Sequence, residues 1–235
     1  MVIIPISEIF ESIQGEGKYV GTPSVFVRFW GCNLRCRFKD KNCDTPYAVN
    51  NRLKNCQQLS YKEVVSTILS CNAKHIVFTG GEPLLYQETI FDIINGLPSC
   101  YTFEVETNGT IPLDPLFYEF NNYNYDKIWY NISVKLMSSN QESGPYDKRR
   151  VNYDAIKSFP REHSCFKFVL TSPDDIKEIN LIKGNVDLTI YLMPEGVTRN
   201  DILKNSQMVI NYCLLYGYRF SPREHIVLWN KKRKK

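Results

Sequence analysis

The amino-acid sequence predicts an α/β fold, a complete or partial (β/α) barrel with about six parallel strands. Two observations predict it: short β-type segments alternate with helical patterns along most of the chain, and several helices begin at capping signals. Alternation of this kind implies crossover connections and is typical of a parallel sheet. The 235 residues, 43% of them hydrophobic, suffice for one substantial core. We therefore expect a single domain over 1–230 and a basic tail over 231–235.

Each element follows from a local pattern. Segments rich in β-branched and aromatic residues predict strands at 24–30, 75–79, 101–107, 127–135, 165–171 and 186–193. Capping signals mark three helix starts, at Ser60 with Glu63, at Ser172 to Asp175, and at Thr198 with Asp201. The last of these helices should end near Gly217. On its residues alone, the glycine-rich segment 9–17 predicts a loop that leads into the first strand.

The charge pattern argues against nucleic-acid binding. The formal net charge is +4, but five basic residues stand together at 231–235, and without them 24 basic residues face 25 acidic ones. The body is nearly neutral, and the basic end reads as a solvated tail. No apolar run approaches the roughly 20 residues that span a bilayer, and no signal-peptide pattern is present. We expect a cytoplasmic protein with no membrane or direct nucleic-acid contact, whose eight cysteines are free thiols or metal ligands.

Three cysteines, Cys32, Cys36 and Cys43, follow the first predicted strand within twelve residues. Thiolates on a loop can converge on a soft metal. A structural zinc site needs a fourth protein ligand, for which Cys56 is the candidate, whereas a catalytic [4Fe-4S] cluster with three protein ligands keeps one iron open. The spacing alone leaves iron–sulfur, zinc and coincidence as alternatives.

Polar motifs stand at the ends of later strands. The segment 80–83 reads GGEP; its glycines permit close backbone approach to a ligand, and its carboxylate can accept hydrogen bonds from an ammonium group. Further polar groups at strand ends are Glu106, Ser133 and Lys135. Read singly, these are a tight turn and exposed strand ends. In α/β barrels, however, functional groups gather at the C-terminal ends of the strands, so the motifs predict one site.

The cysteine loop and the GGEP turn together resemble the radical SAM (S-adenosylmethionine) superfamily, whose signature is CxxxCxxC after the first barrel strand. Cys32 and Cys36 keep the first half, while six residues instead of two precede Cys43. Reading 39–42 as an insertion restores the pattern, with Phe38 in the place of the usual aromatic residue. The resemblance implies a partial barrel of the radical SAM type, with a [4Fe-4S] cluster on the three cysteines. It implies that SAM is bound by Gly80, Gly81, Glu82, Glu106, Ser133, Lys135, Met193 and Asp44.

A closer resemblance covers nearly the whole chain. The stretches IFESIQGEG, GTPSVFVRFWGCNLRC, CDT, GGEP, ETNG, LMPEG and SPREHIVLW are similar to the 7-carboxy-7-deazaguanine synthase family. The resemblance implies a radical SAM carbon–nitrogen lyase of deazapurine biosynthesis, which converts 6-carboxy-5,6,7,8-tetrahydropterin to 7-carboxy-7-deazaguanine with loss of ammonia. It implies substrate contacts by Gln14, Glu16, Arg28, Thr79 and His225, and a Mg²⁺ ion on Thr45.

Three of these residues have plainer interpretations without the resemblance. Arg28 would be a solvent-facing strand residue, His225 a structural histidine and Thr45 a loop hydroxyl. With it, Arg28 would pair with the substrate carboxylate, and Gln14 and Glu16 would recognise the donors and acceptors of the pterin. The Thr45 hydroxyl is a hard oxygen ligand of the kind that Mg²⁺ prefers.

The resemblance also implies a reaction and partners. An electron from the reduced cluster would cleave SAM, and the 5′-deoxyadenosyl radical would abstract hydrogen from C6 before the ring contracts. The electron would come from a donor such as flavodoxin or ferredoxin, and the enzyme would be a homodimer. The destination of the product, in tRNA queuosine, a DNA modification or a small-molecule pathway, stays open. Two alternatives remain: a glycyl-radical-activating enzyme, against which IQGEG and CDT argue, and a zinc-stabilised binding module.

Overall fold

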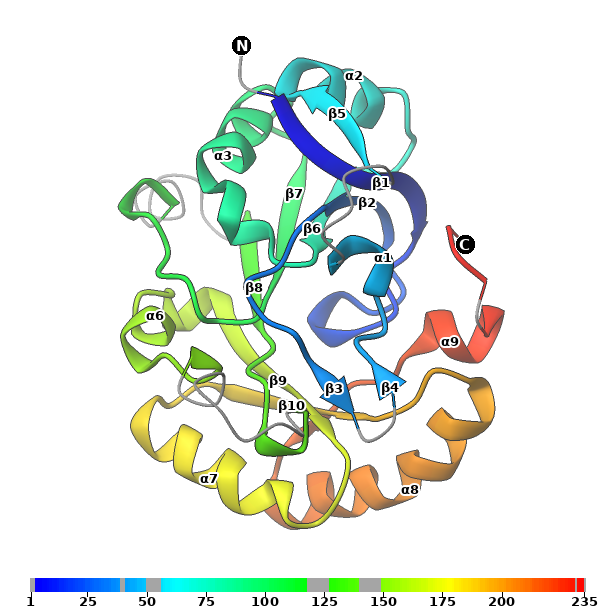
Figure 1. Cartoon of the computed structure of the whole chain (residues 1–235), viewed down its shortest axis with the longest axis vertical. Coiled ribbons are helices and arrows are strands. Elements are labelled where there is room, and N and C mark those ends of the chain that lie inside the picture. Colours follow the sequence, from blue (N-terminus) through cyan, green and yellow to red (C-terminus); the bar gives the residue numbers. More distant parts are fainter. Residues whose placement is uncertain are drawn as a thin grey trace.

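A computed structural model describes residues 3–38, 41–49, 56–117, 127–139, 149–230 and 232–234. Its main sheet has nine strands in the order β11-β10-β9-β8-β7-β6-β2-β1-β5 (Figure 1). These are β1 (Ile3–Ile13), β2 (Pro23–Phe29), β5 (Gln57–Ser60), β6 (His75–Gly80), β7 (Thr102–Thr107), β8 (Ile128–Ile132), β9 (Ser164–Leu170), β10 (Thr189–Pro194) and β11 (Arg219–Phe220). In this order, the seven strands from β11 to β2 are parallel to their neighbours, while β1 runs antiparallel to both β2 and β5.

The strand count corrects the sequence prediction. The six expected strands are present, but β11 adds a seventh parallel strand, and β1 and β5 extend the sheet beyond β2. Across the described residues, no pairing joins β11 to β5, so the sheet is open and a closed barrel is not formed. β11 has only two residues, too few to give a period-two pattern.

The prediction of a loop over 9–17 is wrong for most of its length. Ile9 pairs with Val27 and Ile13 with Pro23, because the segment continues the long strand β1, which lies between β2 and β5 in the sheet. Only the turn after Ile13 carries the glycine-rich sequence, which leads through the 3₁₀ turn η1 (Gly17–Tyr19) into β2. The glycines therefore mark the hairpin turn between two strands and not an N-terminal loop.

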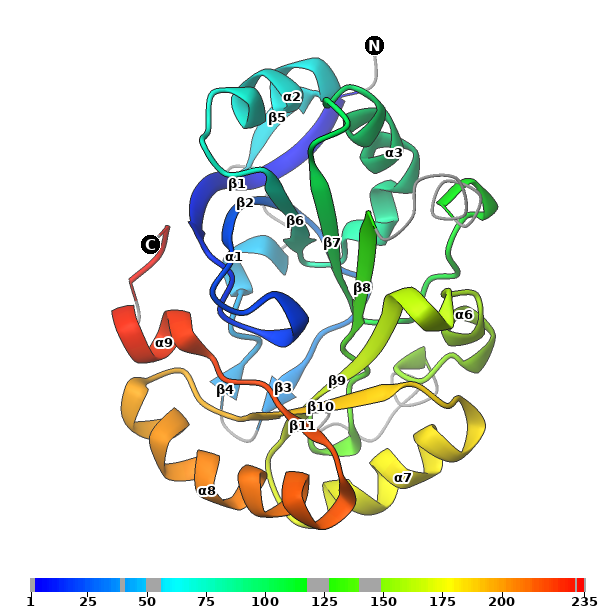
Figure 2. The same ribbon diagram turned by 180° about the vertical axis from the view of Figure 1, so that it is seen from behind.

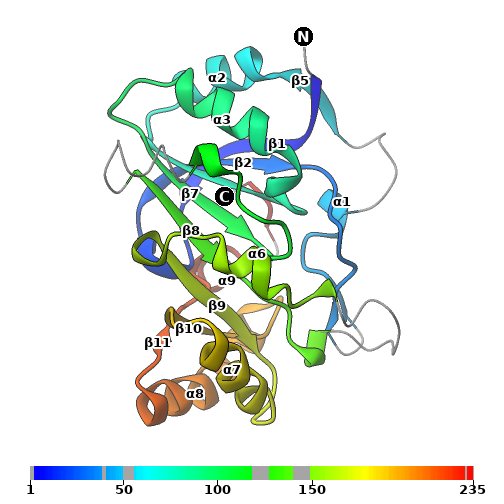
Figure 3. The same cartoon turned by 90° about the vertical axis from the view of Figure 1, so that its left-hand side faces the viewer.

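The longer helices cover one face of the sheet (Figure 2). The longer ones are α2 (Tyr61–Leu69), α3 (Gln87–Asn95), α7 (Asp175–Asn185) and α8 (Arg199–Tyr216), and the shorter ones are α1 (Pro46–Val49), α6 (Tyr153–Lys157) and α9 (Glu224–Trp229). Three more 3₁₀ turns are η3 (Pro83–Tyr86), η4 (Met137–Ser139) and η5 (Arg161–His163). The expected capping boxes form at both α2 and α8, and Gly217 ends α8 at a φ of 69°. Seen from the side, α2 and α3 lie at one end of the curved sheet and α7 and α8 at the other (Figure 3).

The two faces of the parallel strands differ in polarity because side chains alternate along a strand. In β9, Phe166 and Phe168 are fully buried in the main apolar core against the helices, whereas Lys167 and Val169 point to the opposite face. β7 repeats the pattern, with Phe103 in the core and Glu106 on the opposite face. The inner face, opposite the longer helices, thus carries the charged side chains.

Two sequence expectations can be checked directly. None of the eight cysteines, all within the described segments, forms a disulfide, as expected. No helix in the described segments combines the length and apolar composition needed to cross a membrane.

Candidate active site

A cavity of about 540 Å³ opens on the inner face, where the parallel strands end. Its size is that of small-molecule sites in general. All of the predicted site residues except Glu82 line it: Gln14, Glu16, Arg28, Cys32, Cys36, Cys43, Asp44, Thr45, Thr79, Gly80, Gly81, Glu106, Ser133, Lys135, Met193 and His225. The polar motifs, scattered over more than 200 positions of sequence, therefore meet in one place.

Of the four extra residues before the third cysteine, Lys41 and Asn42 form the second strand of a small hairpin, and residues 39–40 lie outside the described ones. β3 (Arg37–Phe38) pairs antiparallel with β4 (Lys41–Asn42), and the N–H of Cys43 donates to the carbonyl of Cys36 at 3.1 Å. The hairpin brings its two ends together, so Cys36 and Cys43 become neighbours despite their separation in sequence. The insertion is compatible with a cavity lined by all three cysteines.

The surroundings of the three thiols suit an iron–sulfur cluster. The N–H of Leu34 donates to Cys32 Sγ at 3.4 Å, a contact typical of cluster sulfurs. Burial raises the pKa of each thiol, that of Cys36 to about 12, while the nearby charge of Lys135 opposes the rise. Burial outweighs this charge, so the metal-free thiols are protonated at neutral pH, and a bound cluster would hold them as thiolates.

The zinc alternative finds less support. In the described segments, no three His, Cys, Asp or Glu side chains gather closely enough to enclose a single ion. Cys56, the proposed fourth zinc ligand, does not line the cavity. Cys32, Cys36 and Cys43 all line it.

The GGEP turn packs against the cysteine loop. A Cβ atom on Gly80 would lie 2.2 Å from Phe29 O, and one on Gly81 would lie 2.0 Å from Gly31 O. The N–H of Glu82 donates to Gly31 O at 2.8 Å. Glycine is required here because two backbones touch, a reason that adds to the expected approach of a ligand.

Glu82 is placed differently from the sequence expectation. Its fully buried carboxylate accepts hydrogen bonds from Thr107 Oγ1 at 2.8 Å, from Asn108 N at 2.7 Å and from Leu84 N at 3.0 Å. Burial raises its pKa to about 7. These donors hold the carboxylate inside the protein, so Glu82 joins the GGEP turn to the end of β7 and its side chain does not face the cavity.

A row of charged side chains crosses the inner face. Arg223 donates from Nη2 to Asp44 at 2.6 Å and from Nε to Glu16 at 3.0 Å. Lys167 Nζ donates to Glu16 at 2.9 Å and also pairs with Glu106. The row therefore connects the residue after the third cysteine to both predicted substrate-binding and SAM-binding carboxylates.

The row gives its carboxylates different acidities. Burial acts to raise the pKa of Glu16, but the charges of Lys167 and Arg223 outweigh it, and the pKa falls below the usual 4.5. At Glu106, burial dominates over Lys167 and raises the pKa to about 7. Glu16 is thus ionised at neutral pH, while Glu106 changes its protonation near neutrality. Burial also lowers the pKa of His225, whose Nε2 lies 3.8 Å from Glu16.

The motifs IQGEG and SPREH form one substructure. Gly17 N donates to Ser221 Oγ at 2.9 Å, and Glu224 N donates to Gly15 O at 3.1 Å. Gln14 Nε2 in turn donates to the buried carboxylate of Glu104. These contacts position Glu16 and His225 at the same side of the cavity.

Sequence reasoning missed several functional neighbours. Lys167 is a lone cation in an apolar strand, and its side chain is only 3% exposed, so it needed an anionic partner. Arg223 lies within SPREH beside His225 and is equally hidden. A charged residue inside an apolar strand was the available signal for Lys167. Glu8 carries the same signal in the apolar strand β1, but its partners Arg28 and Arg233 come from distant segments.

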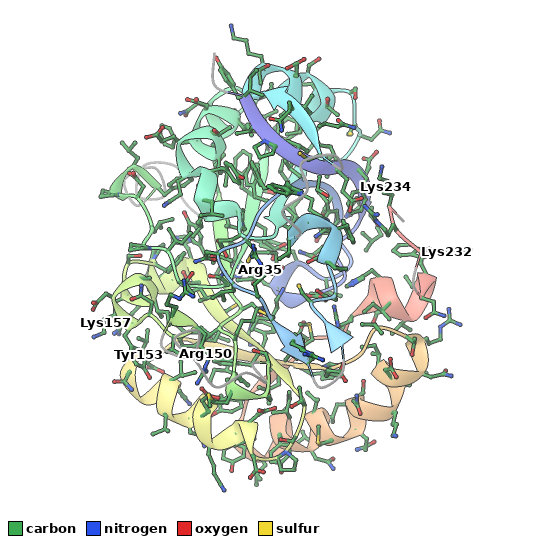
Figure 4. All side chains as sticks on the ribbon, in the orientation of Figure 1. Arg35, Arg150, Tyr153, Lys157, Lys232 and Lys234 are labelled. Carbon is green, nitrogen blue, oxygen red and sulfur yellow. The ribbon has the colours of Figure 1, made fainter. Side chains whose placement is uncertain are left out.

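The prediction of a solvated basic tail is wrong for Arg233. Its Nη2 donates to Glu8 Oε2 at 2.8 Å, and its guanidinium carbon lies 3.5 Å from the ring centre of Tyr47. The attraction has a physical cause, since the Glu8 carboxylate is only 1% exposed and requires positive partners. Lys232 and Lys234, labelled in Figure 4 on the segment after α9, also line the cavity.

Comparisons with known proteins agree with these motifs. No family model matches the chain. The chain is 34% identical over 250 residues to the 7-carboxy-7-deazaguanine synthase of Halobacterium salinarum, with 97% of this chain and 91% of that protein covered. It is 31% identical over 243 residues to the protein of that name from Clostridium acetobutylicum, with 97% of both covered. The crystal structure of QueE from Escherichia coli has a similar fold, with a TM-score of 0.69, 22% identity and 93% of both chains covered.

Proposed function

The chain belongs to the 7-carboxy-7-deazaguanine synthase family, and from that premise we propose that it converts 6-carboxy-5,6,7,8-tetrahydropterin to 7-carboxy-7-deazaguanine with loss of ammonia. The observation that carries the proposal is the single cavity. The cysteine loop, the GGEP turn and the paired IQGEG and SPREH segments all line it. The substrate presents a carboxylate and a guanine-like edge, which these residue types can recognise.

The cofactor end of the cavity is the cysteine loop. Cys32, Cys36 and Cys43 would hold a [4Fe-4S] cluster, and the open curved sheet would serve as the partial barrel of a radical SAM enzyme. When bound, the cluster and SAM supply the one-electron cleavage that starts radical chemistry on the substrate. Lys135, 2.9 Å from Ser133 Oγ, would meet the carboxylate of SAM.

Other residues would orient SAM from the strand ends. The Glu106 carboxylate, held by Lys167 and by Asn131 Nδ2 at 3.0 Å, keeps lone pairs for the ribose hydroxyls. Gly80 and Gly81 present main-chain groups at the end of β6, and Met193 at the end of β10 offers an apolar surface to the adenine. Asp44 is already paired with Arg223, so it would contact SAM through the same salt bridge.

The substrate end lies over β1 and β2. Glu16, kept ionised by Arg223 and Lys167, would accept hydrogen bonds from the N–H groups of the pterin, as its two oxygens have further lone pairs. Thr79 stands beside Arg28 in the paired strands β2 and β6, and His225 closes the same side. The Thr45 hydroxyl would bind Mg²⁺ together with the substrate carboxylate. The side chains thereby fix the ring against the bound SAM and keep water out.

The test is turnover by the reconstituted protein. After anaerobic loading with iron and sulfide, the protein is incubated with SAM, reductant, Mg²⁺ and the carboxylated tetrahydropterin, and the products are identified by mass spectrometry. We expect 7-carboxy-7-deazaguanine. SAM cleavage without that product would reject the substrate, as for a glycyl-radical-activating enzyme, and a protein that holds zinc without iron–sulfur absorbance would reject the whole assignment. Arg161→Gln, on the exposed turn η5, serves as the control variant.

The proposed reaction includes partners. It needs a low-potential one-electron donor, such as flavodoxin or ferredoxin, which fits an enzyme of the reducing cytoplasm. We also expect a homodimer, which light scattering of the purified protein would test. A monomer at micromolar concentration would contradict that expectation.

A further inference from the structure

One end of the cavity holds a cluster of one carboxylate and two guanidinium groups. Glu8 accepts from Arg28 Nε at 2.9 Å and from Arg233 Nη2 at 2.8 Å. The Glu8 carboxylate is 1% exposed and the Arg28 side chain 14%, while Arg233 is half exposed at 51%. All three side chains line the cavity.

This cluster makes the cavity electrically asymmetric. Lys232 and Lys234, the neighbours of Arg233 in the chain, also line the cavity and add two further cations to its described lining. The row across the inner face has no such excess of cations, because Lys167 and Arg223 are paired with Asp44, Glu16 and Glu106, the last of which changes its protonation near neutrality. A ligand with one anionic end is therefore favoured in the orientation that places this end beside Arg28 and Arg233.

The two guanidinium groups retain capacity for an anion. Toward the described residues, Arg28 donates a hydrogen bond only from Nε to Glu8, and Arg233 uses one terminal nitrogen for the same carboxylate. Each guanidinium has five N–H donors, so both keep donors for a second carboxylate. Glu8 holds the two like charges together before any ligand binds, and the Tyr47 ring supports the Arg233 guanidinium by cation–π contact at 3.5 Å.

We propose that Arg233, in the basic tail, completes with Arg28 a subsite for the substrate carboxylate and thereby selects carboxylated pterins. The inference rests on the proposed function, because it assumes a pterin in this cavity. It extends that function by giving the tail a role in substrate recognition. Arg233 acts here as a specificity residue and not in the radical chemistry.

The test compares two ligands on the reconstituted protein. Isothermal titration with SAM present and no reductant measures binding without turnover. The ligands are 6-carboxy-5,6,7,8-tetrahydropterin and the tetrahydropterin that lacks the carboxylate. We expect Arg233→Gln to weaken binding of the carboxylated ligand about tenfold, the effect of one charge-assisted hydrogen bond, and to leave the other ligand unchanged. Arg233→Lys keeps the charge and should lie between wild type and Arg233→Gln.

Each remaining outcome is informative. Equal weakening of both ligands would make the tail a general cover and overturn the proposal, as would no effect on either. Arg161→Gln, the same substitution on an exposed turn, controls for a general change of charge. Wild-type protein that binds neither ligand would instead refute the proposed function. Circular dichroism would verify that Arg233→Gln folds, which the half-exposed position of Arg233 favours.

Discussion

Lys167→Met should destabilise the protein in a pH-dependent way. The side chain of Lys167 is 3% exposed and its ammonium group pairs with both Glu16 and Glu106. Methionine has a similar shape but no charge, so the substitution removes the interaction with little change in packing. Two buried carboxylates then share fewer positive partners.

The magnitude follows from what each carboxylate retains. Removing one partner of a buried ion pair costs about 3–5 kcal/mol. Glu16 keeps Arg223 at 3.0 Å, whereas Glu106 keeps, among the described side chains, only the neutral Asn131 amide as a hydrogen-bond donor at 3.0 Å. Because Glu106 can become neutral by binding a proton, we expect a loss in the free energy of unfolding at the lower end of this range, about 3 kcal/mol. For a chain of this length, that is a fall of about 6–12 °C in Tm.

The sign of the pH dependence follows from Glu106. Burial raises its pKa to about 7 even beside Lys167, above the unfolded value of 4.5. The folded protein therefore binds a proton that the unfolded chain releases, and the free energy of unfolding falls as pH rises between about 4.5 and 7. Without Lys167 the pKa rises further and the fall extends to higher pH. The deficit of Lys167→Met should thus be larger at pH 8.5 than at pH 6.

Urea unfolding of the cluster-free protein, followed by circular dichroism at both pH values, measures this deficit. Lys177→Met is the matched control, since its pair with Asp174 at 3.5 Å is exposed and should contribute less than about 1 kcal/mol. The double variant Lys167→Met/Glu106→Gln should recover part of the loss, because the carboxylate that lost its cation is then replaced by a neutral amide, while Glu16 keeps Arg223. A deficit below about 1 kcal/mol at pH 8.5, or one equal at both pH values, would refute the reasoning.

Three further predictions concern the site. Cys43→Ala should lose the iron–sulfur absorbance and SAM cleavage, while Cys56→Ala should keep both; equal iron content in the two variants would contradict the ligand assignment. Thr45→Ala should raise the Mg²⁺ concentration for half-maximal activity about tenfold or more at unchanged iron content, since one charge-assisted ligand is lost; an unaltered Mg²⁺ titration would exclude the role. Glu82→Gln should cost about 1–3 kcal/mol, because one amide oxygen replaces two acceptor oxygens and the Asn108 N–H loses its partner. Burial raises the pKa of Glu82 to about 7, so the free energy of unfolding of the wild type falls as the pH rises from about 4.5 to 7. The stability deficit of Glu82→Gln, measured by urea unfolding, should therefore be larger at pH 5 than at pH 8. Equal deficits at the two pH values would contradict this.

Local patterns were sufficient for much of the fold. The six main strands and the helix starts at Ser60 and Thr198 are confirmed, because alternation and capping act within a few residues. The patterns failed at β1, where a glycine-rich turn obscured the preceding strand, and at the two-residue β11. Both strands are fixed by pairing with other strands, and the local sequence carries no information about that pairing.

The site divides in a similar way. The sequence by itself determined which functional groups the site can use, since the three cysteines, GGEP and IQGEG supply its metal ligands, hydrogen-bond donors and acceptors. Only the tertiary structure decided which of them face the cavity. The Glu82 carboxylate lies inside the protein because the Thr107 hydroxyl and the Asn108 N–H at the end of β7 donate to it. Arg233, which the sequence placed in a solvated tail, lines the cavity because the buried carboxylate of Glu8 pairs with its guanidinium as well as with that of Arg28. Both outcomes depend on burial, and burial is a property of the assembled fold.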